Sequence, residues 1–344
     1  MYAEENRLEK LSEMGDPLEK IKKTINFEVF RPILKEAFEK ENEAKGRPGY
    51  DYVLMFKILL LQSWYNISDD KAEYIINDRL SFQRFLGLRL YSNVPDAKTI
   101  WLYREKLKES GVYGELFGLF SEMMEEEKVI TRRGSLIDAT FVEVPKQRNT
   151  REENKQIKAG EVPEEWLEET AGAKHKLSQK DVDARWTKKN NETHYGYKDH
   201  VKVDRDSKLI VTFEVTDAAV HDSQKLVDLI DEKDNEVHAD GAYVGEDLHK
   251  SVLDKNPKVE LKINEKGYRN NPLTEEQKAS NKEKSSVRSR VEHVFGHMTN
   301  SMGGLFIRCI GIERARCAIA FKNLAYNISR YCFLKNAKKN VISV

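Results

Sequence analysis

The sequence predicts an α/β protein in which an all-helical N-terminal domain precedes a mixed sheet flanked by helices. Three observations predict this class. Residues 1–130 carry helical spacing and helix-capping signals with almost no strand signal. From Gly134 the pattern changes to short apolar strands separated by turn residues. From Leu273 the helical pattern returns. We therefore expect two domains, 1–130 and 131–344.

The N-terminal half is predicted to be a series of short helices. They are expected at 1–45 (with a new segment from Phe27), 51–66, 68–77, 81–86, 97–109 and 112–128. Ser68 and Asp96 are N-cap signals, and Gly111 is a stop signal. The apolar run 53–65 is interrupted by polar residues and is too short to span a bilayer, so we expect a buried helix.

The C-terminal half is predicted to begin with a strand over 135–144 that carries Asp138 in its middle. A polar stretch at about 145–190 follows, which we expect to be an insertion or a mobile loop. The remaining elements are predicted at 193–204 and 209–215 (a hairpin), 222–230 (helix), 236–239 and 259–263 (strands), and 285–301 and 312–334 (helices).

Three acidic residues in this half are candidates for one shared metal site. Strands disfavour Asp, and burial of the Asp138 carboxylate is costly unless a cation accompanies it. Asp240 ends a later strand, and Glu292 lies on a later helix. Carboxylate oxygens suit Mg²⁺ or Mn²⁺ rather than Zn²⁺, and two such ions clamp the attacking and leaving oxygens of a phosphoryl displacement.

Each acid also has an ordinary structural interpretation. Asp138 would then be half of a buried salt bridge, Asp240 part of a turn with Gly241, and Glu292 a solvated helix residue. A zinc protease is excluded, because His293 is not followed by the Glu of an H-E-x-x-H motif.

Charge is unevenly distributed along a chain whose formal net charge is zero. Residues 281–344 hold 12 Lys and Arg and 3 Asp and Glu (12 − 3 = +9), whereas residues 1–130 hold 20 and 24 (20 − 24 = −4). A basic final segment indicates a polyanion partner, although it would also pack against the acidic remainder of the chain.

The three cysteines form no C-x-x-C pair and are expected to be reduced core residues of a cytosolic protein without a signal peptide.

The order of the predicted elements points to a ribonuclease H-like fold. A strand with Asp is followed by a two-stranded hairpin, a helix, a strand that ends in Asp, another strand and a helix with Glu. Motifs accompany this order over about residues 16–334. They are Gly46-Arg47-Pro48 and the stretches 76–86, 95–101, 137–140, 196–200, 220–223, 239–243 and 288–292. Together they resemble the DDE transposases of bacterial insertion sequences.

The resemblance implies a catalytic triad of Asp138, Asp240 and Glu292 that binds Mg²⁺ or Mn²⁺, with two ions expected. Related transposases carry a Y-x₂-R-x₃-E-x₆-K signature around the Glu. Arg288 fits its Arg, but Ser285 and Thr299 stand where its Tyr and Lys would be. Arg288 would bind a phosphate or pair with an acidic neighbour.

Double-stranded DNA is the partner that the resemblance implies, as terminal inverted repeats and as target DNA. The side chains expected to contact it are Arg288, Arg290, Lys198, His200, His221, Arg47, Arg79, Arg84 and Lys98. The helical domain would recognise the DNA ends, or it would be a support or dimer domain with ordinary surface charges. The resemblance also implies a homodimer that acts on paired DNA ends. We expect the protein in the cytoplasm of a bacterial or archaeal cell, without a membrane partner.

Three functions remain open from the sequence. The first is an active transposase that cuts the ends of its element and transfers the strands into target DNA. The second is a catalytically inactive or domesticated copy that binds DNA without cutting. The third is a ribonuclease H-like nuclease that acts on RNA or a repair junction.

Overall fold

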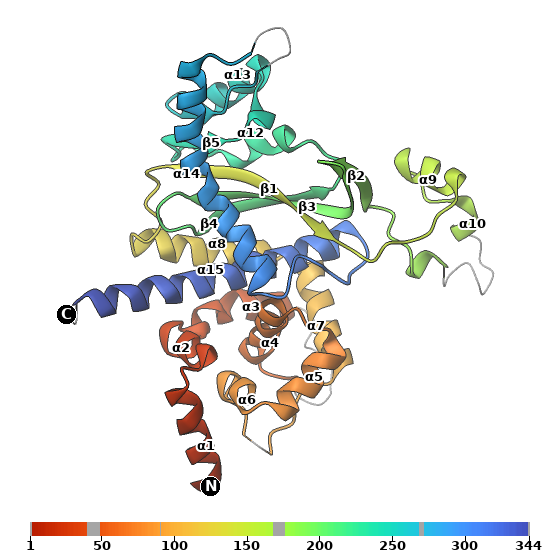
Figure 1. Cartoon of the computed structure of the whole chain (residues 1–344). Helices are drawn as coiled ribbons and strands as arrows, with labels where there is room; N and C mark the ends of the chain where they lie inside the picture. The colour runs from red at the N-terminus through yellow and green to blue at the C-terminus, as the bar shows by residue number, and fades with distance from the viewer. Residues whose placement is uncertain (1, 40–48, 90, 168–175, 268–271, 343–344) are drawn as a thin grey trace.

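The structure is a computed structural model that describes residues 2–39, 49–89, 91–167, 176–267 and 272–342. Figure 1 shows a sheet with the N-terminal helices gathered on one side of it and the long C-terminal helix α15 between the two. In the described ranges, no helix is long and apolar enough to cross a membrane.

The N-terminal helices are α1 (Tyr2–Glu13), α2 (Pro17–Thr24), η1 (Phe27–Phe30), α3 (Arg31–Glu39), α4 (Tyr52–Tyr65), α5 (Asp69–Asp78), α6 (Leu80–Leu86), α7 (Ala97–Ser110) and α8 (Tyr113–Glu126). They lie where the sequence predicts them, except that the first expected segment is divided into α1 and α2. Residues 40–45 of the stretch expected at 1–45 lie outside the described residues. Side chains of Ser68 and Asp96 cap α5 and α7, and Gly111 ends α7 in the left-handed conformation, as predicted. Helix α4 is buried on nearly all sides, which confirms the expected buried helix.

The sheet has six strands. They are β1 (Ser135–Glu143), β2 (Arg185–Lys189), β3 (Glu192–Asp204), β4 (Ile210–Asp217), β5 (Glu236–Ala239) and β6 (Glu260–Ile263). The order is β2-β3-β1-β5-β6, with β4 beside β2 on the outer edge of β3. Strand β3 is antiparallel to its neighbours, and β1, β5 and β6 are mutually parallel. This mixed sheet flanked by helices is the ribonuclease H-like fold that the sequence predicts.

The helices after the sheet's hairpin differ from the prediction mainly in their bounds. They are η2 (Asp222–Lys225), α12 (Leu226–Leu229), η3 (Gly241–Tyr243), α13 (Glu246–Lys255), α14 (Glu275–Asn300) and α15 (Ile312–Ile342). The helix expected at 222–230 is divided into a 3₁₀ turn and one α-helical turn. Helix α14 begins before the expected residue 285, because Thr274 and Gln277 form a capping box there.

The polar stretch between β1 and β3 is not a loop throughout, so that part of the prediction is wrong. It contains α9 (Arg151–Lys158), α10 (Glu164–Leu167) and β2, which pairs with β3. Trp166 is 1% exposed and donates its indole N–H to Glu153 at 2.8 Å. Glu153 also completes the capping box of α9 with Thr150. One buried tryptophan thus organises a segment whose composition is that of a loop.

One hydrophobic core crosses the predicted boundary at residue 130. It joins Phe56 of α4, Phe120 of α8, Leu136 of β1, Val211 of β4 and Phe321 of α15. A second core, with Ile137 and Val237, lies between the sheet and helices α12 and α13. The C-terminal helix therefore packs against both halves of the chain, and the division into two domains stays a prediction.

Candidate active site

Asp138 lies in the middle of β1, between two strands. Its side chain is only 14% exposed and has two partners. Oδ1 accepts the backbone N–H of Ala139 at 2.8 Å, and Oδ2 accepts Nη1 of Arg288 at 2.9 Å. The carboxylate is thus held by the strand on one side and by helix α14 on the other.

Asp240 follows β5, the parallel neighbour of β1. The register pairs Ser135 with Val237 and Leu136 with His238, an offset of 102 (237 − 135). Continued for two residues beyond the last pair, the same offset places Asp240 level with Asp138 (240 − 138 = 102). Asp240 Oδ1 accepts the N–H of Ala242 at 2.7 Å and so caps η3. The register thus brings Asp240, just after β5, to the level of Asp138, and the charge of Asp240 acts on the Asp138 carboxylate.

Glu292 lies on α14, which packs across β1 and β5. Its side chain is 62% exposed, and Oε1 is 3.5 Å from Nη2 of Arg288, one helical turn earlier. Glu292 and Asp138 thus approach the same guanidinium from two elements. Within the described part of the chain, no group of three His, Cys, Asp or Glu side chains is close enough to hold a metal ion. The three acids share a neighbourhood, but they do not converge on one point.

Burial raises the pKa of Asp138 to about 6. The Ala139 N–H and the Arg288 guanidinium pull the pKa down, whereas the negative charge of Asp240 pushes it up. The ionised form is therefore incompletely stabilised where it lies. Hard oxygen donors with excess negative charge fit a divalent cation such as Mg²⁺ by their chemistry.

Two matches to family models cover most of the chain. The family described as "Transposase DDE domain" matches residues 130–328, more than half of the 344 residues. The chain belongs to the DDE transposase family. A second model, "Transposase domain (DUF772)", matches residues 6–106. The chain is thus a transposase with a DDE-type domain and a separate N-terminal transposase segment.

A solved structure resembles this transposase over much of its length. It is the piggyBac transposase, determined by cryo-electron microscopy as a synaptic complex with hairpin DNA. The sequences are 10% identical, the match covers 91% of this chain and 75% of that chain, and the TM-score is 0.44.

Lys198 and His200 of the transposase lie on β3, on the face of the sheet opposite to the Asp138 side chain. Both are buried, because β3 is covered on both faces. Lys198 donates to the Val220 carbonyl at 2.6 Å and to Asp222 at 2.8 Å. Burial lowers the pKa of His200 to about 4, so the ring is neutral at pH 7. We therefore leave these two residues out of the proposed DNA contacts.

The other predicted contacts in the C-terminal half reach the surface. Arg288 is engaged with the carboxylates as described above. Arg290 is exposed and donates to the Arg205 carbonyl at 3.1 Å. His221 is exposed and accepts the N–H of Ser223 at 3.3 Å, so it caps η2. Arg290 and His221 are therefore exposed on the surface, whereas Arg288 is partly buried beside Asp138.

The predicted contacts in the N-terminal half have different environments. Arg79 and Lys98 are exposed at the starts of α6 and α7. Arg84 instead points into the protein, where it bonds to Asp16 and to the hydroxyl of Ser12. Arg47 lies outside the described residues. Arg84 therefore has a structural role that its position in the sequence does not reveal.

Sequence reasoning missed two groups beside the acids. Tyr243 is buried, and its hydroxyl finds no hydrogen-bond partner among the described residues. Burial raises its pKa, and the charges of Asp138, Asp222 and Asp240 raise it further. Lys189, at the end of β2, lies 3.5 Å from Asp222 and lowers the pKa of Asp138. The stretch 239–243 was a signal for Tyr243, but no pattern placed Lys189 near the acids.

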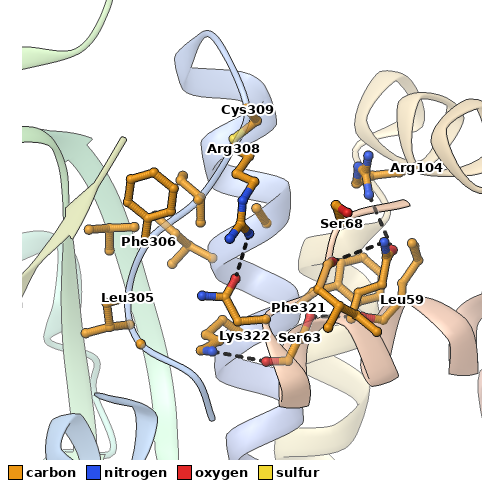
Figure 2. Close-up of a pocket in the computed structure, with 18 of the residues that line it drawn as sticks. Leu59, Ser63, Ser68, Arg104, Leu305, Phe306, Arg308, Cys309, Phe321 and Lys322 are labelled. Carbon is orange, nitrogen blue, oxygen red and sulfur yellow. Dashed lines mark hydrogen bonds between the residues drawn. The ribbon is translucent and has the colours of Figure 1, made fainter. Parts of the chain in front are cut away.

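A cavity of about 300 Å³ lies on the same sheet face as Asp138, between the N-terminal helices and α15 (Figure 2). Its wall includes Phe306 and Arg308 of the segment before α15, and Lys322 donates to the Ser63 carbonyl at 3.0 Å across it. Asp199, which pairs with Thr140 of β1, also lines the cavity. The acids of the candidate site do not line it, so the cavity is a separate feature of the junction between the two halves.

Proposed function

We propose that this transposase cuts DNA at the ends of its own element and joins the freed strands to target DNA, with Asp138, Asp240 and Glu292 as its catalytic acids. The observation that carries the proposal is the placement of Asp138 and Asp240 at one level of adjacent strands, beneath the helix of Glu292. Burial, together with the negative charge of Asp240, raises the pKa of Asp138, and a bound cation would stabilise the ionised carboxylate.

The three acids would hold Mg²⁺ or Mn²⁺, with two ions proposed, which would activate the attacking oxygen and stabilise charge on the leaving oxygen. Asp138 would be the central of the three ligands, because the charge of Asp240 acts on its carboxylate and Arg288 links it to Glu292. The backbone N–H groups of Ala139 and Ala242 would fix the carboxylates of Asp138 and Asp240. Arg288 and Arg290 would hold DNA phosphates.

Two reactions follow, and both balance without an energy source. In hydrolysis, the oxygen of water bonds to phosphorus and the bond from phosphorus to the 3′ oxygen breaks, which leaves a 3′-hydroxyl and a 5′-phosphate. In strand transfer, that 3′-hydroxyl oxygen bonds to a phosphorus of the target strand, whose own 3′ oxygen departs with a proton. Strand transfer forms one phosphodiester bond for each that it breaks, whereas hydrolysis converts a phosphodiester into a phosphate monoester and an alcohol.

We further propose that residues 1–130 recognise the terminal inverted repeats and that residues 131–344 catalyse. The exposed Arg79 and Lys98 support a contact between the N-terminal part and phosphate. Two copies would act together on paired ends, on the DNA of a bacterial or archaeal cell. Native mass spectrometry of the complex with end DNA tests the dimer.

A cleavage assay tests the function. The full chain is incubated with Mg²⁺ and a duplex that carries the DNA flanking its gene. Wild type should cut at the repeat, whereas Asp138→Asn, Asp240→Asn and Glu292→Gln should bind the duplex and not cut it. Glu283→Gln, an exposed acid on the same helix, is the matched control and should cut normally.

Two outcomes would favour the other functions. If wild type binds the duplex but cuts nothing, the chain is an inactive or domesticated DNA-binding protein. If it cuts unrelated RNA or branched junctions in preference to the repeat, it is a ribonuclease H-like nuclease with another substrate.

A further inference from the structure

Arg288 contacts two of the three acids at once. Its Nη1 lies 2.9 Å from Asp138 Oδ2, and its Nη2 lies 3.5 Å from Glu292 Oε1. The third acid, Asp240, influences Asp138 through its charge. The guanidinium thus occupies the space between a strand acid and a helix acid of the candidate site.

This arrangement leaves Arg288 incompletely bonded. Its Nε is buried and has no hydrogen-bond partner among the described residues. A buried donor without a partner costs free energy. The guanidinium of Arg288 thus does not make all of its possible hydrogen bonds in this position. The contact to Glu292 at 3.5 Å is long for a hydrogen bond. Arg288 can therefore leave the carboxylates at modest cost when a better partner is offered.

The same guanidinium excludes a second cation from these acids. Positive charges a few ångströms apart repel one another strongly in a partly buried site. Asp138 is 14% exposed, so water screens this repulsion poorly. A divalent cation bound to Asp138 and Glu292 would therefore have to displace Arg288.

DNA offers Arg288 the better partner. The planar fork of arginine fits the oxygens of a phosphate with two parallel bonds. Arg288 keeps 20% of its side chain exposed, and it lies in the segment 281–344, which holds 12 basic and 3 acidic residues. A duplex attracted to this basic segment brings phosphates towards the exposed part of Arg288.

We propose that Arg288 is an internal counter-ion that occupies the acid site until a DNA phosphate draws it away, so that DNA and the divalent cation each favour the binding of the other. The inference rests on the proposed function, since it takes Asp138 and Glu292 as metal ligands. It adds an order of assembly: the site accepts its metal after DNA has engaged Arg288. In the free enzyme, Arg288 is the cation beside Asp138 and Glu292.

Binding of Mn²⁺ to the full chain tests the coupling. Free Mn²⁺ is followed by electron paramagnetic resonance with and without a random-sequence duplex of about 30 base pairs, since phosphate contacts are independent of sequence. A blank of duplex alone corrects for Mn²⁺ on the DNA. Wild type should bind Mn²⁺ on the order of tenfold more tightly with the duplex present.

Arg288→Gln should bind Mn²⁺ on the order of tenfold more tightly than wild type in the absence of DNA, and should gain little more when DNA is added. Lys282→Gln removes an exposed positive charge from the same helix; it is the control for the DNA-free measurement and should match wild type. Unchanged or weaker Mn²⁺ binding by Arg288→Gln overturns the inference.

A measurement on wild type alone keeps the inference testable if Arg288→Gln fails to fold. Coupling between two ligands is reciprocal, so saturating Mn²⁺ must tighten duplex binding by the same factor. Asp138→Asn at equal Mn²⁺ corrects for ionic screening. If Mn²⁺ changes the duplex affinity of wild type and of Asp138→Asn by the same factor, the inference is overturned.

Failure of the proposed function gives a different result. If, with the duplex present, Asp138→Asn binds Mn²⁺ as tightly as wild type, then Asp138 is not a metal ligand and the catalytic assignment falls. If Asp138→Asn loses Mn²⁺ but DNA has no effect on wild type, the assignment stands and only the counter-ion role of Arg288 falls.

Discussion

Trp64 donates its indole N–H to the backbone carbonyl of Ala325 at 2.8 Å, although the two residues are 261 positions apart in the chain. The bond joins α4 of the N-terminal helices to α15, and it is buried. Lys322, one turn earlier on α15, bonds to the carbonyl of Ser63 beside it. The helical half and the sheet therefore share one structural support, so we expect them to unfold together.

Trp64→Phe tests this shared support. The substitution removes the buried hydrogen bond between α4 and α15, which should lower the free energy of unfolding by about 0.5–1.5 kcal/mol. Amide hydrogen exchange should become faster in α4 and in β4, and the two elements should accelerate by the same factor. Trp101→Phe, at an exposed tryptophan, should change neither value by more than about 0.5 kcal/mol. Faster exchange confined to α4 would show that the halves unfold separately.

Asp199 predicts a dependence of stability on pH. Burial raises the pKa of Asp199 to about 7, whereas its pKa in the unfolded chain is about 4. Between these values the folded state binds the extra proton, so Asp199 lowers the stability of wild type as the pH rises, and the effect levels off above about pH 7. As the pH rises over this range, the free energy of unfolding of Asp199→Asn should therefore increase relative to that of wild type, by up to about 4 kcal/mol.

Urea denaturation at a series of pH values measures that difference. The exposed Asp254→Asn on α13 is the control and should run parallel to wild type. A constant difference between Asp199→Asn and wild type from about pH 4 to pH 8 would mean that Asp199 ionises normally in the folded protein.

Lys202 is expected to be indispensable for folding. Its side chain is 0% exposed on β3 and bonds to Asp234 at 2.8 Å and to Asp231 at 2.7 Å. Lys202→Met leaves the buried Asp234 carboxylate without its main cation, so we expect a loss of about 3–5 kcal/mol, measured by thermal and urea denaturation. Lys233→Met, an exposed lysine near the same turn, should lose less than about 1 kcal/mol. Equal losses in the two variants would contradict the assignment.

Arg79 and Lys98 test the N-terminal contact with DNA. Both are exposed, and phosphate contacts release counterions from DNA. Each change to Gln should weaken duplex binding at every sequence and lower the slope of log K against log salt by about 1. Fluorescence anisotropy at several salt concentrations measures both effects. Glu115→Gln, an exposed residue of α8, is the charge-change control. An unaltered slope would favour the support or dimer role of this half.

The strands and their acids were predictable because local signals determine them. Turn residues and apolar runs define β1, β5 and β6, and parallel strands end at one edge of a sheet. The offset that places Asp240 level with Asp138 follows once β1 and β5 are paired. The sequence left open whether Arg288 binds phosphate or an acid, and the pairing with Asp138 depends on how α14 crosses β1, which no local pattern specifies.

The orientation of Lys198 and His200 was not predictable for a different reason. A strand covered on one face alternates apolar and polar residues, but β3 is covered on both faces, so the alternation gives no direction. The burial of Arg84 likewise depends on Asp16 and Ser12 from an earlier helix. Contacts between distant segments decided each of these cases.

The position of α15 has a consequence for defective copies of the gene. The last helix completes the core of the N-terminal helices, with Phe321 against Phe56 at a ring distance of 5.8 Å. A copy interrupted before this helix would leave the N-terminal core open to water. We therefore expect shortened copies to yield unfolded chains that cells degrade, rather than fragments that occupy the element's ends and compete with the intact protein. A truncated copy of the gene would then not inhibit the intact protein.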